Sequence, residues 1–166
     1  AAPQAAPGIW DAILAAGSEF SIKPCGLGAR NTLRLEAAMA LYGKEIDETT
    51  TPWEAGLGWI VKMDKGDFLG REALERQQAE GVRRKLAGFE MRGRGVARDG
   101  YQILVGGRPA GRVTSGGPSP TLNSCIGLCY LPVEAAAVGQ PIEIVIRGQA
   151  VPAEVVKTPF YKRARQ

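Results

Sequence analysis

Histidine is absent from this chain of 166 residues, which removes the side chain that most often acts as a general base near neutral pH. Acid–base or nucleophilic chemistry would have to use Asp, Glu, Tyr, Lys or Cys, or residues outside the chain. Cysteine is scarce as well, since Cys25, Cys125 and Cys129 form no CxxC pair. Without a histidine, these three cysteines do not complete a metal site. We therefore predict no metal and expect all three to be small buried side chains in a reducing compartment.

Long apolar runs are missing too, and none approaches the length needed to span a membrane. The opening residues AAPQAAPG have neither the basic start nor the continuous apolar core of a signal peptide. Aromatic residues make up only 7% of the chain and are not interleaved with basic ones, which argues against nucleic-acid binding. The remaining composition, 45% hydrophobic and 23% charged, is typical of a soluble globular protein with one domain or two small ones.

Positive charge is in mild excess, with a formal net charge of +4. Basic residues gather at RRK (residues 83–85), at Arg92, Arg94 and Arg98, and in the final YKRARQ. A solvated surface and a basic tail explain this distribution. An electrostatic match to an acidic protein partner is the alternative.

Helical and extended segments alternate in the first half of the chain. Apolar residues at helical spacing predict three helices, over residues 7–16, 27–40 and 67–81. The second helix is expected to have an apolar face that includes Leu33, Ala37 and Met39. Two segments are predicted to be extended, residues 18–26 and 53–63, the second as a strand that carries Trp59.

Short strands separated by Gly, Pro and Asn turns fill the second half. The candidate strands are KLAGFEM, GYQILVGGRPAGRVTSG, SCIGLCYL and PIEIVIRGQAVPAEVVK, with GGRPAG as a hairpin loop. This order predicts an α+β fold that ends in a small, closed or partly closed antiparallel β-barrel. We place the boundary near residues 81–86, which divides the chain into regions 1–82 and 83–166.

The stretch from Gly26 to Trp59 contains the clearest candidate binding residues. Arg30 stands at the start of an amphipathic helix, and a polar loop leads from there to Trp59 in the run GLGW. An arginine and an aromatic ring brought together in this way can hold a flat, anionic ligand. An exposed arginine and a tryptophan buried in the core are the structural alternatives.

Four segments, in this order, carry a resemblance to a known family: the stretch just described, DFLGREAL (residues 67–74), GRVTSGGPSPTL (111–122) and VPAEVVKTPF (151–160). Together they resemble the C-terminal part of the aminomethyltransferase (T-protein) of the glycine cleavage system. The resemblance implies a truncated α/β folate-binding domain followed by the barrel. It also implies an enzyme that takes an aminomethyl group from the lipoyl arm of the H-protein, releases ammonia and forms 5,10-methylenetetrahydrofolate from tetrahydrofolate. Such an enzyme works in the bacterial cytoplasm or the mitochondrial matrix.

The same resemblance assigns roles to individual residues. Arg30 matches an arginine of the family's folate pocket, and Trp59 matches a tryptophan near the aromatic portion of the ligand. We interpret Arg34 and Glu36 as structural partners. The family has a glycine in most members at the position of Ala38. No catalytic residue is predicted within the chain, because the family's catalytic aspartate belongs to the N-terminal half, and we expect the fragment alone to be inactive.

Other interpretations remain open at this point. A folate-dependent demethylase module of the dimethylglycine or sarcosine type would share the fold and the pocket. A non-catalytic folate-binding protein of the superfamily would carry a cysteine where KGDFLGRE has Asp67. The run TSGGPSPTL suits a tight turn that either shapes the barrel or directs backbone N–H groups at an anion.

Overall fold

The computed structural model describes residues 2–163, so the last three residues of the predicted basic tail lie outside it. By their contacts the residues form two units, Ala1–Arg30 and Asn31–Gln166. Within the described residues, no helix combines the length and the apolar character needed to cross a membrane.

The first unit contains the helix α1 (Ala6–Ala16), flanked by the short 3-10 helices η1 (Pro3–Ala5) and η2 (Ser18–Phe20). The predicted helix over residues 7–16 is confirmed. It ends where the Gly17 N–H donates to the Ile13 carbonyl at 2.9 Å. The extended segment predicted from residue 18 is wrong at its start, because the Ser21 N–H turns back to the Ser18 carbonyl and closes a 3-10 turn.

The helix α2 (Leu27–Glu36) is shorter than the predicted 27–40. Its end is closed by the Met39 N–H, which donates to the Arg34 carbonyl at 2.8 Å, while Ala38 takes a left-handed φ of 54°. The predicted apolar face is wrong, since Leu33 and Met39 are exposed. The residues that α2 buries are Arg34, Leu35 and Glu36.

The strand predicted over residues 53–63 is also wrong. This described segment consists of turns and the 3-10 helix η3 (Gly58–Ile60). Gly56 has a left-handed φ of 71°, and a Cβ on Gly58 would lie 2.5 Å from the Trp53 ring. The chain therefore bends tightly at this point. The helix α3 (Arg71–Glu80) follows and confirms the third predicted helix, although it begins four residues later than the predicted 67.

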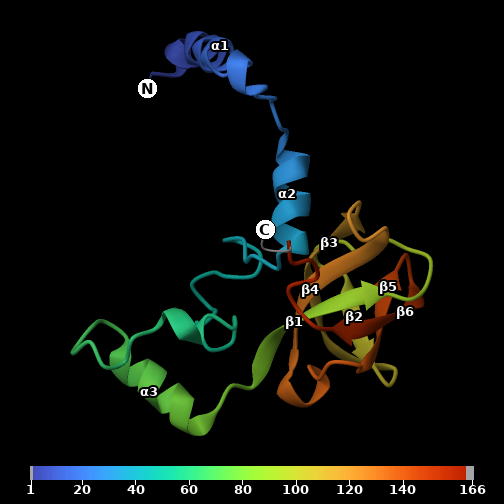
Figure 1. Cartoon of the computed structure of the whole chain (residues 1–166). Coiled ribbons are helices and arrows are strands. Elements are labelled where there is room, and N and C mark those ends of the chain that lie inside the picture. Colours follow the sequence, from blue (N-terminus) through green and yellow to red (C-terminus); the bar gives the residue numbers. More distant parts are fainter. Residues whose placement is uncertain (1, 164–166) are drawn as a thin grey trace. The chain divides into compact units, whose positions relative to one another are not determined.

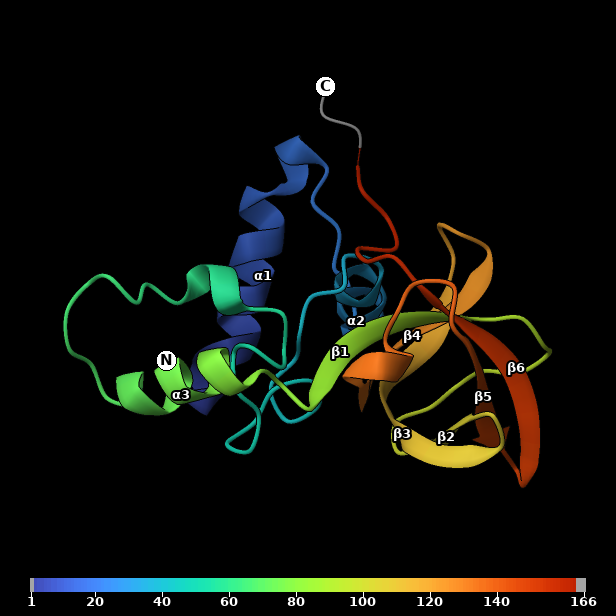
Figure 2. The same ribbon diagram turned by 90° about the horizontal axis from the view of Figure 1, so that it is seen from below.

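The predicted strands of the second half form a closed antiparallel barrel of six (Figures 1 and 2). They are β1 (Arg84–Met91), β2 (Gln102–Val105), β3 (Arg108–Ser119), β4 (Ser124–Pro132), β5 (Pro141–Ile146) and β6 (Gln149–Val156), with the 3-10 helix η4 (Val133–Ala135) after β4. The strand order is β1-β4-β3-β2-β5-β6, and β6 pairs with β1 to close the barrel. The pairing of β1 with β6 covers only Gly88–Met91, and the Leu86 N–H on β1 donates instead to the Glu54 carbonyl at 2.9 Å.

Alternating apolar side chains fill the barrel. The core side chains that are at most 1% exposed include Phe89, Ile103, Val113, Leu131, Ile144 and Val155. Gly127 on β4 allows the close packing, since a Cβ there would lie 2.3 Å from the Phe89 ring. The hairpin between β2 and β3 turns on Gly106 and Gly107 alone, both left-handed, so the RPAG of the predicted loop belongs to β3.

The three cysteines differ in burial. Cys129 is fully buried in β4, Cys125 is half-buried, and Cys25 is exposed. The prediction that all three are buried is therefore wrong for Cys25, which lies in a segment after η2 rather than in the barrel. Burial raises the pKa of the Cys129 thiol well above its usual range, so this side chain behaves as a small hydrophobic group.

Candidate functional site

An apolar cavity of about 470 Å³ in the second unit has Trp59 in its wall. Its lining comes from the turn after α2, from the region of η3 and from the barrel strands β1 and β4. The larger lining side chains are Met39, Ile46, Leu57, Trp59, Leu86 and Leu128. The volume falls in the range of about 300–1,000 Å³ that small-molecule sites occupy. The cavity can therefore accept the apolar or aromatic part of a ligand.

Trp59 is 75% exposed, so its ring is not part of the hydrophobic core. It is carried by η3 and not by the predicted strand. Arg30, the other predicted site residue, is exposed in the first turns of α2, and its N–H donates to the Gly26 carbonyl at 3.3 Å. Its guanidinium makes no hydrogen bond or ion pair with any residue from 2 to 30, the described part of the first unit. Arg30 belongs to the first unit and Trp59 to the second.

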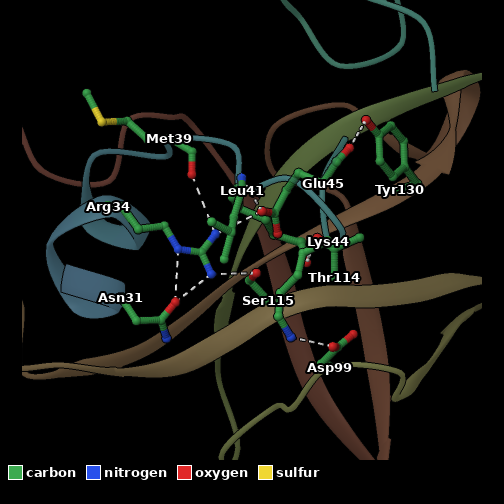
Figure 3. Close-up of polar contacts among 11 residues, drawn as sticks. Asn31, Arg34, Met39, Leu41, Lys44, Glu45, Asp99, Thr114, Ser115 and Tyr130 are labelled. Carbon is green, nitrogen blue, oxygen red and sulfur yellow. Dashed lines mark hydrogen bonds and ion pairs between the residues drawn. The ribbon is translucent and has the colours of Figure 1, made fainter. Parts of the chain in front are cut away.

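A buried ion pair holds the wall of the Trp59 cavity against the barrel (Figure 3). The Arg34 guanidinium donates to Glu45 Oε2 at 2.8 Å and to Ser115 Oγ on β3 at 2.8 Å. Two further donors reach Asn31 Oδ1 at 2.6 and 2.9 Å. The Leu41 N–H also donates to Glu45 Oε2, at 2.9 Å. The Glu45 carboxylate thus binds Arg34, before the turn that follows α2, and also Leu41, after that turn.

Glu36 forms a second polar attachment, to the connection between β3 and β4. Its carboxylate accepts from Ser119 Oγ at 2.5 Å, from Thr121 Oγ1 at 2.8 Å and from the Thr121 N–H at 3.2 Å. Burial by itself would raise the pKa of Glu36, but these hydrogen bonds outweigh it and lower that pKa below its usual value. Arg34 and Glu36 therefore each bind other parts of the chain, which is the structural role predicted for both residues.

The run TSGGPSPTL combines the two roles that sequence left open. Its first part lies in β3, and the connection to β4 shapes one end of the barrel. A backbone N–H of this connection, that of Thr121, does face an anion. The anion is the chain's own Glu36 carboxylate.

Sequence reasoning missed Glu45, which is fully buried. Its sequence, YGKEID, looks like a solvated loop, and Lys44 beside it is indeed exposed and pairs with Asp99. A buried carboxylate at this position depends on Arg34, eleven residues earlier, and on Tyr130, whose hydroxyl donates to the Glu45 carbonyl at 2.8 Å. A local pattern cannot reveal partners at those separations.

The arrangement can bind and position a ligand. Within residues 2–163, no cluster of three His, Cys, Asp or Glu side chains is placed to hold a metal ion. Desolvation raises the pKa of Tyr130 to about 12, so its phenol stays protonated at neutral pH. Its hydroxyl is already engaged with Glu45.

Two family descriptions match this chain. The GCVT N-terminal domain matches residues 1–65, and the glycine cleavage T-protein C-terminal barrel domain matches residues 84–162. The second match covers all six barrel strands. A closed C-terminal barrel is the feature that the second description names, and the chain belongs to the glycine cleavage T-protein family.

Individual relatives agree with this assignment. The aminomethyltransferase of Nostoc sp. is 54% identical over 165 residues, which cover 99% of this chain and 43% of the relative. That of Symbiobacterium thermophilum is 54% identical over 155 residues, covering 93% of this chain and 41% of the relative. The crystal structure of glycine cleavage system aminomethyltransferase T from Bartonella henselae superposes with a TM-score of 0.86 at 30% identity, over 95% of this chain and 44% of that one. The chain thus spans less than half the length of these relatives.

Proposed function

We propose that this chain is the C-terminal part of a tetrahydrofolate-dependent aminomethyltransferase of glycine degradation. The complete enzyme would take the aminomethyl group from the lipoylated H-protein, release ammonia and form 5,10-methylenetetrahydrofolate. The observation that carries the proposal is the Trp59 cavity, in a chain whose family is defined. Bacterial relatives favour the cytoplasm as its location. We further propose that residues 1–82 belong to the folate-binding region and residues 83–166 to the barrel domain.

The cavity suits the aromatic part of a folate. Its wall is largely apolar, and the exposed Trp59 ring offers a flat face for stacking. Bound tetrahydrofolate would supply the nitrogen atoms that accept the one-carbon unit. Arg30 would make charge-assisted hydrogen bonds to ligand oxygens or hold an active-site carboxylate, for which its unpaired guanidinium is available.

A basic groove on the barrel suits an acidic protein partner, which is the alternative explanation of the charge distribution. It has a volume of about 670 Å³ and is lined by Arg94, Arg98 and Arg147. The nearby carboxylate of Asp99 pairs with Lys44, while the three arginines have no acidic partner within residues 2–163. A Cβ on Gly95 would lie 2.7 Å from Ile146 Cδ1, so the loop lies close against the barrel. We propose that carboxylates of the H-protein contact this groove.

The role of Arg30 can be tested in the full-length protein. We expect Arg30→Ala to reduce folate-dependent aminomethyl transfer by about 10- to 100-fold, because a charge-assisted hydrogen bond contributes about 1.5–3 kcal/mol. Its melting temperature should stay close to that of the unaltered protein. The matched control is Arg76→Ala, which removes another exposed arginine, from α3. Full activity in Arg30→Ala would contradict the assigned role.

The fragment itself supplies a second test. We expect residues 1–166 alone to show no aminomethyl transfer and only weak folate binding, because positioning groups of the complete site are missing. The assay would compare lipoylated H-protein with N-methyl amines as donors for the full-length enzyme. Robust turnover by the fragment would contradict its proposed inactivity, and turnover of N-methyl amines by the full-length enzyme would favour the demethylase alternative.

A further inference from the structure

A third cavity lies on the outer face of the barrel, and it is distinct from both the Trp59 cavity and the basic groove. Its volume is about 570 Å³. It is lined on one side by the loop around Asp47, Thr49 and Thr50, and on the other by the strands β1, β3 and β4. Two residues of the predicted basic cluster RRK, Arg83 and Arg84, line it.

The lining is rich in positive charge. Four basic side chains contribute to it, Lys44, Arg83, Arg84 and Arg112, against one acidic side chain, Asp47. Asp47 Oδ1 is occupied within its own loop, where it accepts hydrogen bonds from the Thr49 N–H and from both threonine hydroxyls. Those bonds lower the pKa of Asp47, so this carboxylate stays ionised and fixed at neutral pH.

Two of the basic groups already have acidic partners. Arg84 donates to Glu54 at 2.8 Å and stacks on the Tyr130 ring, with its guanidinium carbon 4.8 Å from the ring centre. Lys44 pairs with Asp99. These contacts hold one side of the cavity rigid and leave little charge on Arg84 and Lys44 for a ligand.

The other two guanidiniums are free to pair with an anion. Arg112 faces Tyr130 in the register of β3 and β4, so both side chains lie on the same face of the sheet. Among residues 2–163, its guanidinium donates only to the Gly100 carbonyl, at 3.1 Å. Arg83 makes no side-chain hydrogen bond or ion pair with residues 2–163, and both arginines are exposed. A guanidinium fork matches the oxygens of a phosphate or carboxylate group.

We propose that this cavity binds a small oxyanion, either a phosphate or a carboxylate compound, with Arg83 and Arg112 as its charge-pairing residues. The threonine hydroxyls in the lining already donate within the chain, those of Thr49 and Thr50 to Asp47 Oδ1 and that of Thr114 to the Leu128 carbonyl, so the two arginines supply the attraction for the ligand. The site does not depend on the proposed folate chemistry, because none of its lining residues lines the Trp59 cavity.

The test is an amide NMR titration of the 17.6 kDa chain at low ionic strength, with inorganic phosphate in one arm and citrate in the other. We expect saturable shifts in the amides around residues 49–50, 83 and 112. The arm with the lower dissociation constant identifies the preferred anion. Arg83→Gln and Arg112→Gln should each weaken binding by about tenfold or more.

The matched control is Arg108→Gln, which removes the same charge from the same strand but does not line the cavity. We expect it to change the dissociation constant less than about twofold. Equal weakening by all three variants, or shifts confined to Arg94, Arg98 and Arg147, would overturn the proposal. Displacement of phosphate by tetrahydrofolate would instead make this cavity part of the folate site and contradict its independence.

Discussion

The barrel and the segment before it in the second unit, residues 31–83, bury opposite kinds of side chain. The barrel encloses an apolar core, with Phe89 and Ile103 fully buried. Residues 31–83 bury three charged side chains, Arg34, Glu36 and Glu45, beside the apolar Leu35 and Ala55. Hydrophobic burial scales with area and is not directional, whereas buried charges require partners at defined positions. The barrel is therefore held by its own apolar pattern, and the preceding segment is held in place by specific polar contacts.

Large apolar side chains in residues 31–83 also differ from those of the barrel, because several of them are exposed. Met39, Trp59, Ile60 and Leu69 are all more than half exposed. A cluster of exposed apolar residues commonly marks a surface that another part of a protein covers. In the relatives, more than half of the length lies outside the match to this chain. We propose that some of that additional chain covers these residues in the full-length protein.

The largest effect on the free energy of unfolding should come from a substitution in the apolar core of the barrel. We expect Phe89→Ala to lower the free energy of unfolding by about 3–5 kcal/mol, because it leaves a cavity in the closed barrel. Leu69→Ala, which removes another large apolar side chain, should change it by less than about 0.5 kcal/mol because Leu69 is fully exposed. Urea denaturation followed by circular dichroism measures both. Equal losses would show that the two regions do not differ as described.

A smaller effect on the free energy of unfolding should come from removing a buried charge in residues 31–83. We expect Glu36→Gln to cost about 2 kcal/mol at neutral pH, since the amide cannot accept all three hydrogen bonds. The pKa of Glu36 is lower in the folded than in the unfolded chain. Its contribution is therefore fully present above the ordinary glutamate pKa and is lost as the pH falls through the folded-state value.

The pH profile separates this role from simple packing. The difference in unfolding free energy between the unaltered protein and Glu36→Gln should be constant above about pH 6 and shrink on acidification below about pH 4.5. Glu48→Gln, at an exposed position in the nearby loop, is the control and should show almost no difference. A Glu36→Gln deficit that did not change with pH would contradict the carboxylate's role.

The smallest effect should be an increase in stability. Ala38 holds a left-handed φ of 54° at the end of α2, which costs an L-residue about 1 kcal/mol relative to glycine. We expect Ala38→Gly to stabilise the chain by about that amount in thermal or urea unfolding. Ala40→Gly, two residues on and without a left-handed φ, should instead be neutral or destabilising. The left-handed φ also gives a physical reason for the glycine that the resemblance implies at this position.

The candidate site was predictable only in part. The resemblance identified Arg30 and Trp59, and both roles stay predictions. Periodicity placed Trp59 on a strand, whereas Gly56 and Gly58 allow a tight bend that carries it on a 3-10 helix. The cavity beside Trp59 could not be read from the sequence, because its walls come from segments as distant as Met39 and Leu128.

The sequence by itself determined the α+β class, the helices α1 and α3, and the alternating strands that close into a barrel. These features depend on local apolar spacing and on glycines at turns such as Gly106–Gly107, which neighbouring residues define. Only the tertiary structure decided which face of α2 is buried and that Glu45 lies in the interior. Arg34 and Glu36 are buried because Ser115, Ser119 and Thr121, about eighty residues later in the chain, supply their hydrogen bonds. Burial of a charged side chain is costly without hydrogen-bonding partners, and these partners come together only when the barrel has formed.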